Sequence, residues 1–166
     1  LDREQQRELP REPIEWLKKA GFGAVRVPTQ YGGDGISQQQ LFKLLIELAT
    51  ADSNIVQALR GHFAFVEDRL IAHRDASQEL WFKRFVNGEI AGNAWTEIGA
   101  VQIGDVITRV TQNENGRLVV NGEKYYSTGT IFAEWIDLFA LDETTNQHVI
   151  AAVSTKETGV HVSDDW

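Results

Sequence analysis

The period of the hydrophobic pattern changes near Gly88, and this change limits the possible folds more than any other feature of the sequence. Before Gly88, apolar residues recur every three or four positions, which places them on one face of an α-helix. After Gly88, short apolar runs are separated by Asn-Gly and other turn residues, as in β-strands. We therefore expect an α+β fold in two domains, helical over 1–88 and β over 89–166.

The first domain should be an antiparallel helical bundle. Ser37 and Gln40 have the spacing of a capping box at the start of its second helix. Leu44 in the second helix and Leu80 in the fourth lie on apolar faces, so we expect both to be buried. The four predicted helices cover about 12–20, 37–51, 53–70 and 77–87.

The second domain should be part of an antiparallel β-barrel, because several short strands with regular turn signals are typical of that architecture. Turns are expected at 113–116 and at Asn121-Gly122. The predicted strands cover 90–96, 105–112, 117–120, 134–141, 148–154 and 159–162. In the first domain, the glycine-rich segment 32–35 lacks the Lys-Ser/Thr of a phosphate-binding loop, so we interpret it as a turn with positive φ angles.

Composition excludes several classes of function. The formal net charge is −8, from 24 acidic and 16 basic residues, and no basic cluster is long enough to bind nucleic acid. No apolar stretch is long enough to span a membrane. Cysteine is absent, and the four histidines lack metal-site spacing, so no metal is expected. The charged N-terminus has no apolar signal region, and a cytoplasmic location is therefore expected.

Methionine is absent even at position 1, and the chain stops at Trp166 within the β-structure. A β-domain that ended there would leave an exposed sheet edge. We therefore expect the sequence to be part of a longer protein, with its second domain incomplete.

Two segments of the second domain combine aromatic side chains with hydroxyl groups near a strand end. Residues 92–100 read Gly-Asn-Ala-Trp-Thr-Glu-Ile-Gly-Ala, and residues 121–129 read Asn-Gly-Glu-Lys-Tyr-Tyr-Ser-Thr-Gly. A flat aromatic surface beside hydrogen-bond donors suits a planar heteroaromatic ligand such as an isoalloxazine ring. The same residues are also ordinary strand content, and chemistry alone favours that interpretation.

In this order, and after a helical bundle, the two segments resemble the acyl-CoA dehydrogenase superfamily, whose motifs read roughly T-E-P-G-A-G-S-D and N-G-x-K-x-W-I-T/S. Residues 27–33, Val-Pro-Thr-Gln-Tyr-Gly-Gly, are similar to the family's V-P-x-x-Y-G-G loop. The three motifs together span nearly the whole chain. The resemblance implies a flavin cofactor, with FMN favoured and FAD as the alternative.

On this resemblance, Thr96 matches a threonine that hydrogen-bonds the pyrimidine edge of the flavin. Tyr126 stands where the family has a tryptophan against the ring, and Thr128 where a hydroxyl meets flavin N5. Glu97 is expected to have a structural role. The strand beside the ring would be formed by Asn93, Ala94 and Trp95.

Two departures from the family pattern bear on the reaction. Ile98 replaces the family's proline, and Val101-Gln102-Ile103 replace its Gly-Ser-Asp, which removes polar character where a phosphate-rich ligand would pass. The motifs look more like those of the flavin-dependent monooxygenase branch that acts on dibenzothiophene and alkyl sulfones. In that branch Asn93 and Ser127 would lie near the C4a–N5 edge of the flavin, where oxygen activation needs hydrogen-bond donors.

His62 lies on the inward stripe of the third predicted helix, between Leu59 and Val66. A buried histidine on an apolar stripe is more often a hydrogen-bonded core residue than a catalytic one. The monooxygenase branch nevertheless has a histidine on this helix that faces the flavin. On that resemblance His62 would be catalytic together with Ser127, and both interpretations remain open.

We therefore expect a two-component FMNH2-dependent monooxygenase that takes reduced flavin from a separate reductase and acts on a small-molecule substrate. The alternatives are FAD-dependent oxidation of the Cα–Cβ bond of an acyl-CoA and, from a different class, a catalytically silent binding or assembly module. The resemblance also implies a homo-oligomer, a tetramer in the family, and a C-terminal helical domain that is absent here. Without that domain, the 166 residues should bind flavin weakly and be inactive.

Overall fold

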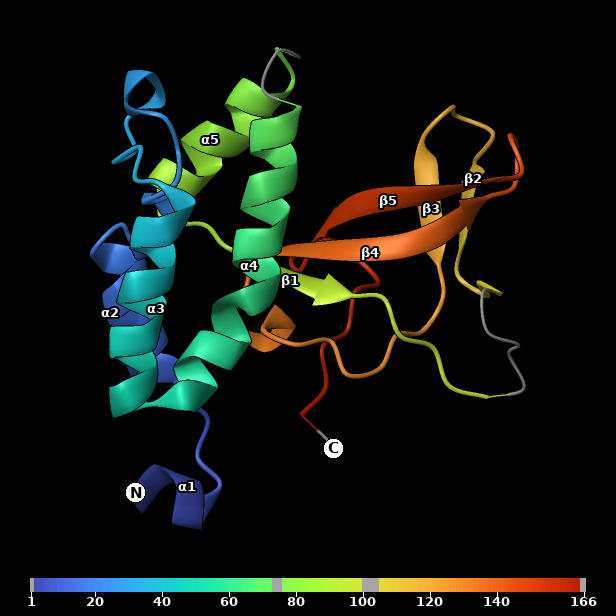
Figure 1. Cartoon of the computed structure of the whole chain (residues 1–166). Helices are drawn as coiled ribbons and strands as arrows, with labels where there is room; N and C mark the ends of the chain where they lie inside the picture. Colours follow the sequence, from blue (N-terminus) through green and yellow to red (C-terminus); the bar gives the residue numbers. More distant parts are fainter. Residues whose placement is uncertain (1, 73–75, 100–104, 165–166) are drawn as a thin grey trace.

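The computed structural model describes residues 2–72, 76–99 and 105–164. Helices gather on one side of the molecule and strands on the other, and the longest helix lies where the two parts meet (Figure 1). The predicted α+β class is therefore confirmed. The change of hydrophobic period at Gly88 coincides with the passage from the last helix to the first strand.

The helical part contains the four predicted helices and an additional short one at its start. Ser37 accepts a hydrogen bond from the backbone N–H of Gln40, whose side chain accepts one from the N–H of Ser37, so the predicted capping box is confirmed. Asp52 caps the following helix by accepting from the N–H of Asn54 at 3.0 Å. The helices are α1 (Asp2–Gln6), α2 (Arg11–Lys19), α3 (Gln38–Ala51), α4 (Ser53–Ile71) and α5 (Gln78–Val86).

Two expectations of burial were wrong. The side chain of Leu44 on α3 is 39% exposed and that of Leu80 on α5 is 53% exposed. On α3, only Leu41 is fully buried. The physical reason is that α3 and α5 each contact the core through one narrow face. No element among the described residues covers their outer faces.

The core of the helical part is built around α4. As predicted, Ile55, Leu59, His62 and Val66 are buried. The three apolar residues of this stripe pack in two clusters, the second of which also contains Phe65, Phe82 and Phe85. The 3-10 helices η1 (Phe22–Ala24) and η2 (Thr29–Tyr31) connect α2 to α3 along this core.

The glycine-rich segment 32–35 forms the predicted turn. Gly32 and Gly35 have φ angles of 94° and 61°, which glycine adopts more readily than other residues. A side chain at Gly33 would place its Cβ 2.3 Å from the carbonyl oxygen of Val27. The glycines are thus explained by backbone geometry, in agreement with the structural interpretation.

A five-stranded sheet forms the other part of the molecule. Strand β4 pairs along its whole length with β5 in an antiparallel register, and β2 and β3 form an antiparallel hairpin. Asn113 closes that hairpin, because its side-chain oxygen accepts from the N–H groups of Asn115 and Arg117, as the turn prediction required. The strands are β1 (Ala91–Ala94), β2 (Arg109–Gln112), β3 (Leu118–Asn121), β4 (Trp135–Asp142) and β5 (Gln147–Ser154).

The sheet is open, as expected for part of a β-barrel, and differs from the prediction in being mixed where a purely antiparallel sheet was expected. Strands β1 and β2 both pair with β4 in parallel, β1 with its first half and β2 with its last two residues. Parallel pairing is possible because long connections separate these strands from β4 in the sequence. No strand forms at the predicted position 159–162, where the chain bends and Val160 packs against the inner face of the sheet.

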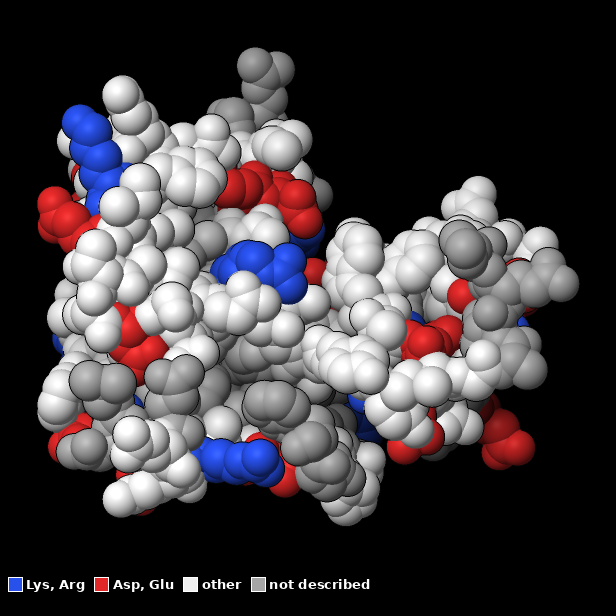
Figure 2. Space-filling view, turned by 60° about the horizontal axis from the view of Figure 1, so that its bottom comes forward, with Lys and Arg blue, Asp and Glu red and all other residues white. Residues whose placement is uncertain are grey.

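The two parts of the molecule share their core at β1. Ile90 and Ala133 belong to one apolar cluster of the helical part, and Ala91 and Trp135 pack in the other. In the space-filling view the two parts meet at an open angle, with acidic and basic side chains intermixed on the visible face (Figure 2). Strand β1 is therefore both the edge of the sheet and part of the helical core.

Gly129 should be the glycine least tolerant of substitution at this junction. Its φ is 78°, and a Cβ there would lie 2.0 Å from the carbonyl oxygen of Ala58 on α4. We expect Gly129→Ala to lower the free energy of unfolding by about 2–4 kcal/mol, because strain and a backbone clash combine. Gly159 is a matched control with a φ of 90° and no atom near its Cβ position, so Gly159→Ala should cost only about 1 kcal/mol. Equal losses in urea unfolding would contradict the close approach.

Candidate functional site

The two sequence motifs lie side by side along β1. The N–H of Asn93 donates to the carbonyl of Thr128 at 3.3 Å, and the N–H of Tyr125 donates to the carbonyl of Thr96 at 2.9 Å. The hydroxyl of Thr130 donates to the carbonyl of Asn93 at 3.4 Å. Since β4 occupies the opposite edge of β1, residues 125–130 line the edge that β4 leaves free.

This arrangement depends on a glycine in β1. A Cβ at Gly92 would lie 2.3 Å from the Cα of Thr130, so no other residue fits without moving the second segment. The next element, the 3-10 helix η3 (Thr130–Phe132), then leads under α4 toward β4. Close backbone approach therefore brings together the residues predicted to bind the cofactor.

Asn93 is a half-buried polar residue whose side chain is incompletely satisfied. Its Oδ1 atom is buried and has no hydrogen-bond partner among the described residues. The side chain lies against Gly61 on α4, where a Cβ would come within 2.6 Å of Oδ1. A buried acceptor without a donor is costly unless water or a ligand supplies one.

Trp95 is held on the same face of the sheet as Asn93. Its indole N–H donates to Oδ2 of Asp137 at 3.1 Å, and its ring stacks on Phe139 with centroids 5.5 Å apart. The indole is 46% exposed, whereas Asp137 is buried. Burial raises the pKa of Asp137, and the hydrogen bond from Trp95 opposes that shift. The structure thus fixes the orientation of one large aromatic surface beside the two motifs.

The second motif presents its side chains at the surface. Tyr126 is 73% exposed and has a φ of 54°, an unusual value for a residue with a side chain. The N–H of Thr128 donates to the carbonyl of Tyr126 at 2.8 Å, which closes a tight turn around Ser127. Thr96 is exposed, while Ser127 and Thr128 are half-buried, so three hydroxyl groups lie at the rim of the site.

Glu97 holds the base of the loop that follows β1. Its carboxylate accepts from the N–H groups of Ile107 and Thr108, from the Thr108 hydroxyl, and from the ammonium of Lys124 at 2.8 Å. Burial would raise the pKa of Glu97, but these hydrogen bonds dominate and lower it to about 2. These contacts favour the structural role expected for Glu97. Positions 101–103, where the family pattern is lost, lie outside the described residues.

Lys124 belongs to the site, although sequence reasoning did not select it. Its side chain is 8% exposed and also donates to the carbonyl of Trp95 at 3.4 Å. Gly122, two residues earlier, packs against Thr108 so closely that a Cβ would lie 2.3 Å from the hydroxyl oxygen. The available signal was the Gly-x-Lys spacing of the second motif, whose partners become visible only in three dimensions.

His62 is placed in the core and does not join the other predicted residues. It is fully buried; its Nε2 lies 2.8 Å from the carbonyl of Gly23, and its Nδ1 accepts from the N–H of Ala91 at 3.2 Å. Burial lowers its pKa to about 4, against a smaller opposing effect of the bond to Gly23. Both ring nitrogens are therefore engaged by backbone, which supports the structural interpretation of this histidine.

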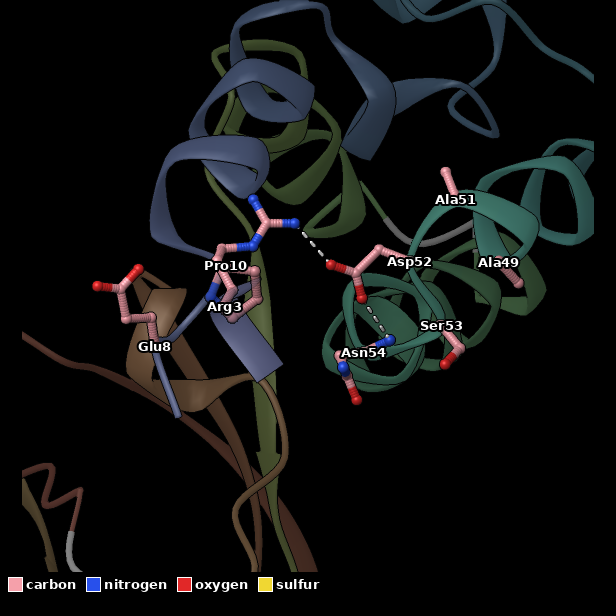
Figure 3. Close-up of a pocket in the computed structure, with 8 residues that line it drawn as sticks. All are labelled: Arg3, Glu8, Pro10, Ala49, Ala51, Asp52, Ser53 and Asn54. Atoms are coloured by element: carbon pink, nitrogen blue, oxygen red, sulfur yellow. Dashed lines mark hydrogen bonds and ion pairs between the residues drawn. The ribbon is translucent and has the colours of Figure 1, made fainter. Parts of the chain in front are cut away.

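A cavity of about 260 Å³ lies elsewhere, where α1 meets the junction of α3 and α4 (Figure 3). Arg3 reaches across it to Asp52 at 2.7 Å, and the other carboxylate oxygen of Asp52 caps α4. None of the predicted site residues lines this cavity. Within the described ranges, no three acidic or histidine side chains gather as a metal site, and no helix is long and apolar enough to cross a membrane.

Residues 1–89 match the family model for the acyl-CoA dehydrogenase N-terminal domain. In this chain the matched helical part is followed by the mixed sheet that carries the two motifs, which together define an α+β protein. The match covers more than half of the chain, and the chain belongs to the acyl-CoA dehydrogenase family.

Two relatives of this chain are named as monooxygenases. A dibenzothiophene monooxygenase from Rhodococcus erythropolis is 28% identical over 92% of this chain and 37% of its own length. A probable FMNH2-dependent monooxygenase, SfnC from Pseudomonas putida, is 24% identical over 100% of this chain and 41% of its own length. The chain thus spans about two fifths of these relatives.

A solved structure shares the fold. FMN-bound TdsC from Paenibacillus superposes with a TM-score of 0.83 at 22% identity, over 99% of this chain and 42% of that one. The arrangement of α4, β1 and the sheet is therefore that of a known fold.

The buried histidine should make stability depend on pH. Because the folded pKa of His62 is about 4, below the unfolded value, the unfolded chain takes up a proton first as pH falls. The stabilising effect is full above pH 6.5 and declines toward pH 4, by on the order of 2–3 kcal/mol. Urea unfolding between pH 7 and 4.5 should show this slope. His62→Gln keeps a donor and an acceptor without titrating, so it should remove the contribution of His62 to this slope. Equal slopes in the variant and the parent chain would contradict the low pKa of His62.

The tyrosine at position 126 should lower the stability of the fold while it favours the binding of an aromatic ligand. Because its left-handed backbone is strained and its ring is mostly exposed, Tyr126→Asn should raise the free energy of unfolding by about 0.5–1 kcal/mol. The same variant should weaken the binding of any aromatic ligand that stacks on the tyrosine ring. Tyr126→Phe keeps both ring and strain and should change neither quantity. Loss of stability in the Asn variant would show that the tyrosine ring is needed for folding.

Proposed function

We propose that this chain forms part of a flavin-dependent oxidoreductase and contributes one side of its flavin site. The observation that carries the proposal is the meeting of both predicted motifs along the free edge of β1. The exposed indole of Trp95, the exposed ring of Tyr126 and the unpartnered oxygen of Asn93 lie on these motifs. An isoalloxazine ring fits this chemistry, because it offers flat faces for stacking and N–H donors at its edge.

Each residue then has a task. The Thr96 hydroxyl bonds the pyrimidine edge of the flavin, and Tyr126 lies against the ring. Thr128 and Ser127 present hydroxyl groups to the N5 edge, where Ser127 is the proposed catalytic donor and Asn93 assists it. The bound flavin supplies the redox chemistry. His62 receives a positioning role in place of a catalytic one, because both of its ring nitrogens hold backbone groups.

Within this family, we favour the FMNH2-dependent monooxygenase branch. Support comes from the relatives named as monooxygenases and from the loss of the Gly-Ser-Asp motif at 101–103. A separate reductase would then supply reduced flavin, and a small molecule would be oxygenated. Acyl-CoA oxidation with FAD is the second candidate, supported by the family to which residues 1–89 belong. A cytoplasmic homo-oligomer is the assembly we propose for either reaction.

Flavin titration tests the proposal directly. The 166-residue chain should quench FMN fluorescence with a weak, micromolar or higher Kd. Thr96→Val, which keeps the shape but removes the hydroxyl, should raise that Kd about 5- to 10-fold through loss of one hydrogen bond. Thr158→Val is the matched control, because Thr158 is exposed near the far end of the chain. A chain that binds neither FMN nor FAD, while circular dichroism shows it folded, would refute the proposed site.

The reaction is tested with reduced flavin supplied by a reductase. A protein of the monooxygenase branch that contains this chain should consume oxygen in the presence of a sulfur-containing aromatic substrate. Anaerobic bleaching of bound flavin by an acyl-CoA would instead support the dehydrogenase. If neither response is observed, the silent binding or assembly module is the remaining candidate.

A further inference from the structure

We infer that Lys124 is a positioning residue for the flavin site, acting through Glu97 and the backbone of Trp95. The inference rests on the proposed function, because the geometry it protects is that of the cofactor site. The side chain of Lys124, itself a residue of the second motif, is 8% exposed and is placed to hold the two motifs together without touching the ligand.

Lys124 connects the second motif to the first through side-chain hydrogen bonds. Its ammonium donates to a carboxylate oxygen of Glu97 at 2.8 Å and to the carbonyl of Trp95 at 3.4 Å. The next residue, Tyr125, donates its N–H to Thr96. Three consecutive residues of the first motif, 95–97, are thus bonded to two consecutive residues of the second. A strand end held at this many points has little freedom to change the separation of Thr96 and Tyr126.

Glu97 extends this connection to the start of β2. Its carboxylate binds the N–H groups of Ile107 and Thr108, so it fixes the place where the chain returns to the sheet. The side chains of Glu97 and Lys124 are 7% and 8% exposed. A charge pair shielded in this way, with its oxygens filled by further donors, is worth more than an exposed ion pair, and breaking it leaves one buried charge uncompensated.

The topology of the sheet explains why the Glu97–Lys124 pair (here called the brace) is needed. Strands β1 and β2 follow each other along the same edge of β4, and the chain leaves that edge between Ala94 and Arg109. Thr96 and Tyr126 lie beyond the ladder of β1 with β4, where one isolated bridge between Thr96 and Tyr125 holds the two segments. Glu97 and Lys124 add side-chain hydrogen bonds to this single bridge at the point where the ligand would lie.

The decisive experiment compares Lys124→Gln, Lys124→Arg and Glu97→Gln with Lys43→Gln in the whole 166-residue chain. Lys43 is an exposed lysine on α3 and serves as the matched control. The readouts are FMN affinity by fluorescence titration and hydrogen exchange of the Tyr125, Ile107 and Thr108 amides. Circular dichroism and thermal unfolding identify any variant that fails to fold, in which case Lys124→Arg is the variant to be judged.

We expect Lys124→Gln to weaken FMN binding at least about tenfold and to accelerate exchange at Tyr125, because the site loses its geometry. Lys124→Arg should restore part of both, and Lys43→Gln should change neither. In the double variant of Lys124 and Glu97, the losses should be less than additive. Unchanged FMN affinity in Lys124→Gln, with normal binding by the parent chain, would overturn the inference whatever happens to exchange.

Failure of the proposed function gives a different result. The parent chain would then bind no flavin, while amide exchange in Lys124→Gln would still report whether Lys124 holds the two segments together. Accelerated exchange without flavin binding in the parent chain would refute the flavin site and keep the brace. Unaltered exchange in that case would refute both.

Discussion

The close approach of three segments to β1 is the constraint on which the rest of the structure depends. On one edge β1 pairs with β4, on the other it meets residues 125–130, and α4 lies across its face. Glycines make this possible, since a Cβ at Gly61, Gly92 or Gly129 would clash with a neighbouring segment of the same chain. A strand of four residues thereby joins the helical core to the sheet and supports the proposed site.

The polar groups around β1 fall into two sets with different physical roles. Those that are saturated by the protein, such as the ring of His62 and the carboxylate of Glu97, hold backbone in place. Those left open, above all Oδ1 of Asn93 and the hydroxyl of Thr96, lie on the motifs themselves. On this division we propose that residues of the first set, His62 among them, build the site, and that residues of the second set serve the ligand.

Much of the fold was predictable because it depends on local rules. The capping box at Ser37, the turn at Asn113 and the inward stripe of α4 each follow from residue spacing alone. The failures involve residues whose environment is decided at a distance. Leu44 and Leu80 carry the pattern of buried residues, yet their burial requires a covering element that the described chain lacks. Likewise, the periodicity of β1 and β2 cannot reveal that both run parallel to β4.

The sequence by itself determined the order of helical and β parts, the family, and the two motifs that carry the proposed cofactor site, since these reside in residue types and their spacing. Only the tertiary structure decided which side chains of those motifs are engaged by the protein. Lys124 and Glu97 are charged residues like any others until burial and mutual contact make them a brace. His62 could have faced a ligand or the core, and the carbonyl of Gly23 and the N–H of Ala91, far away in sequence, place it in the core.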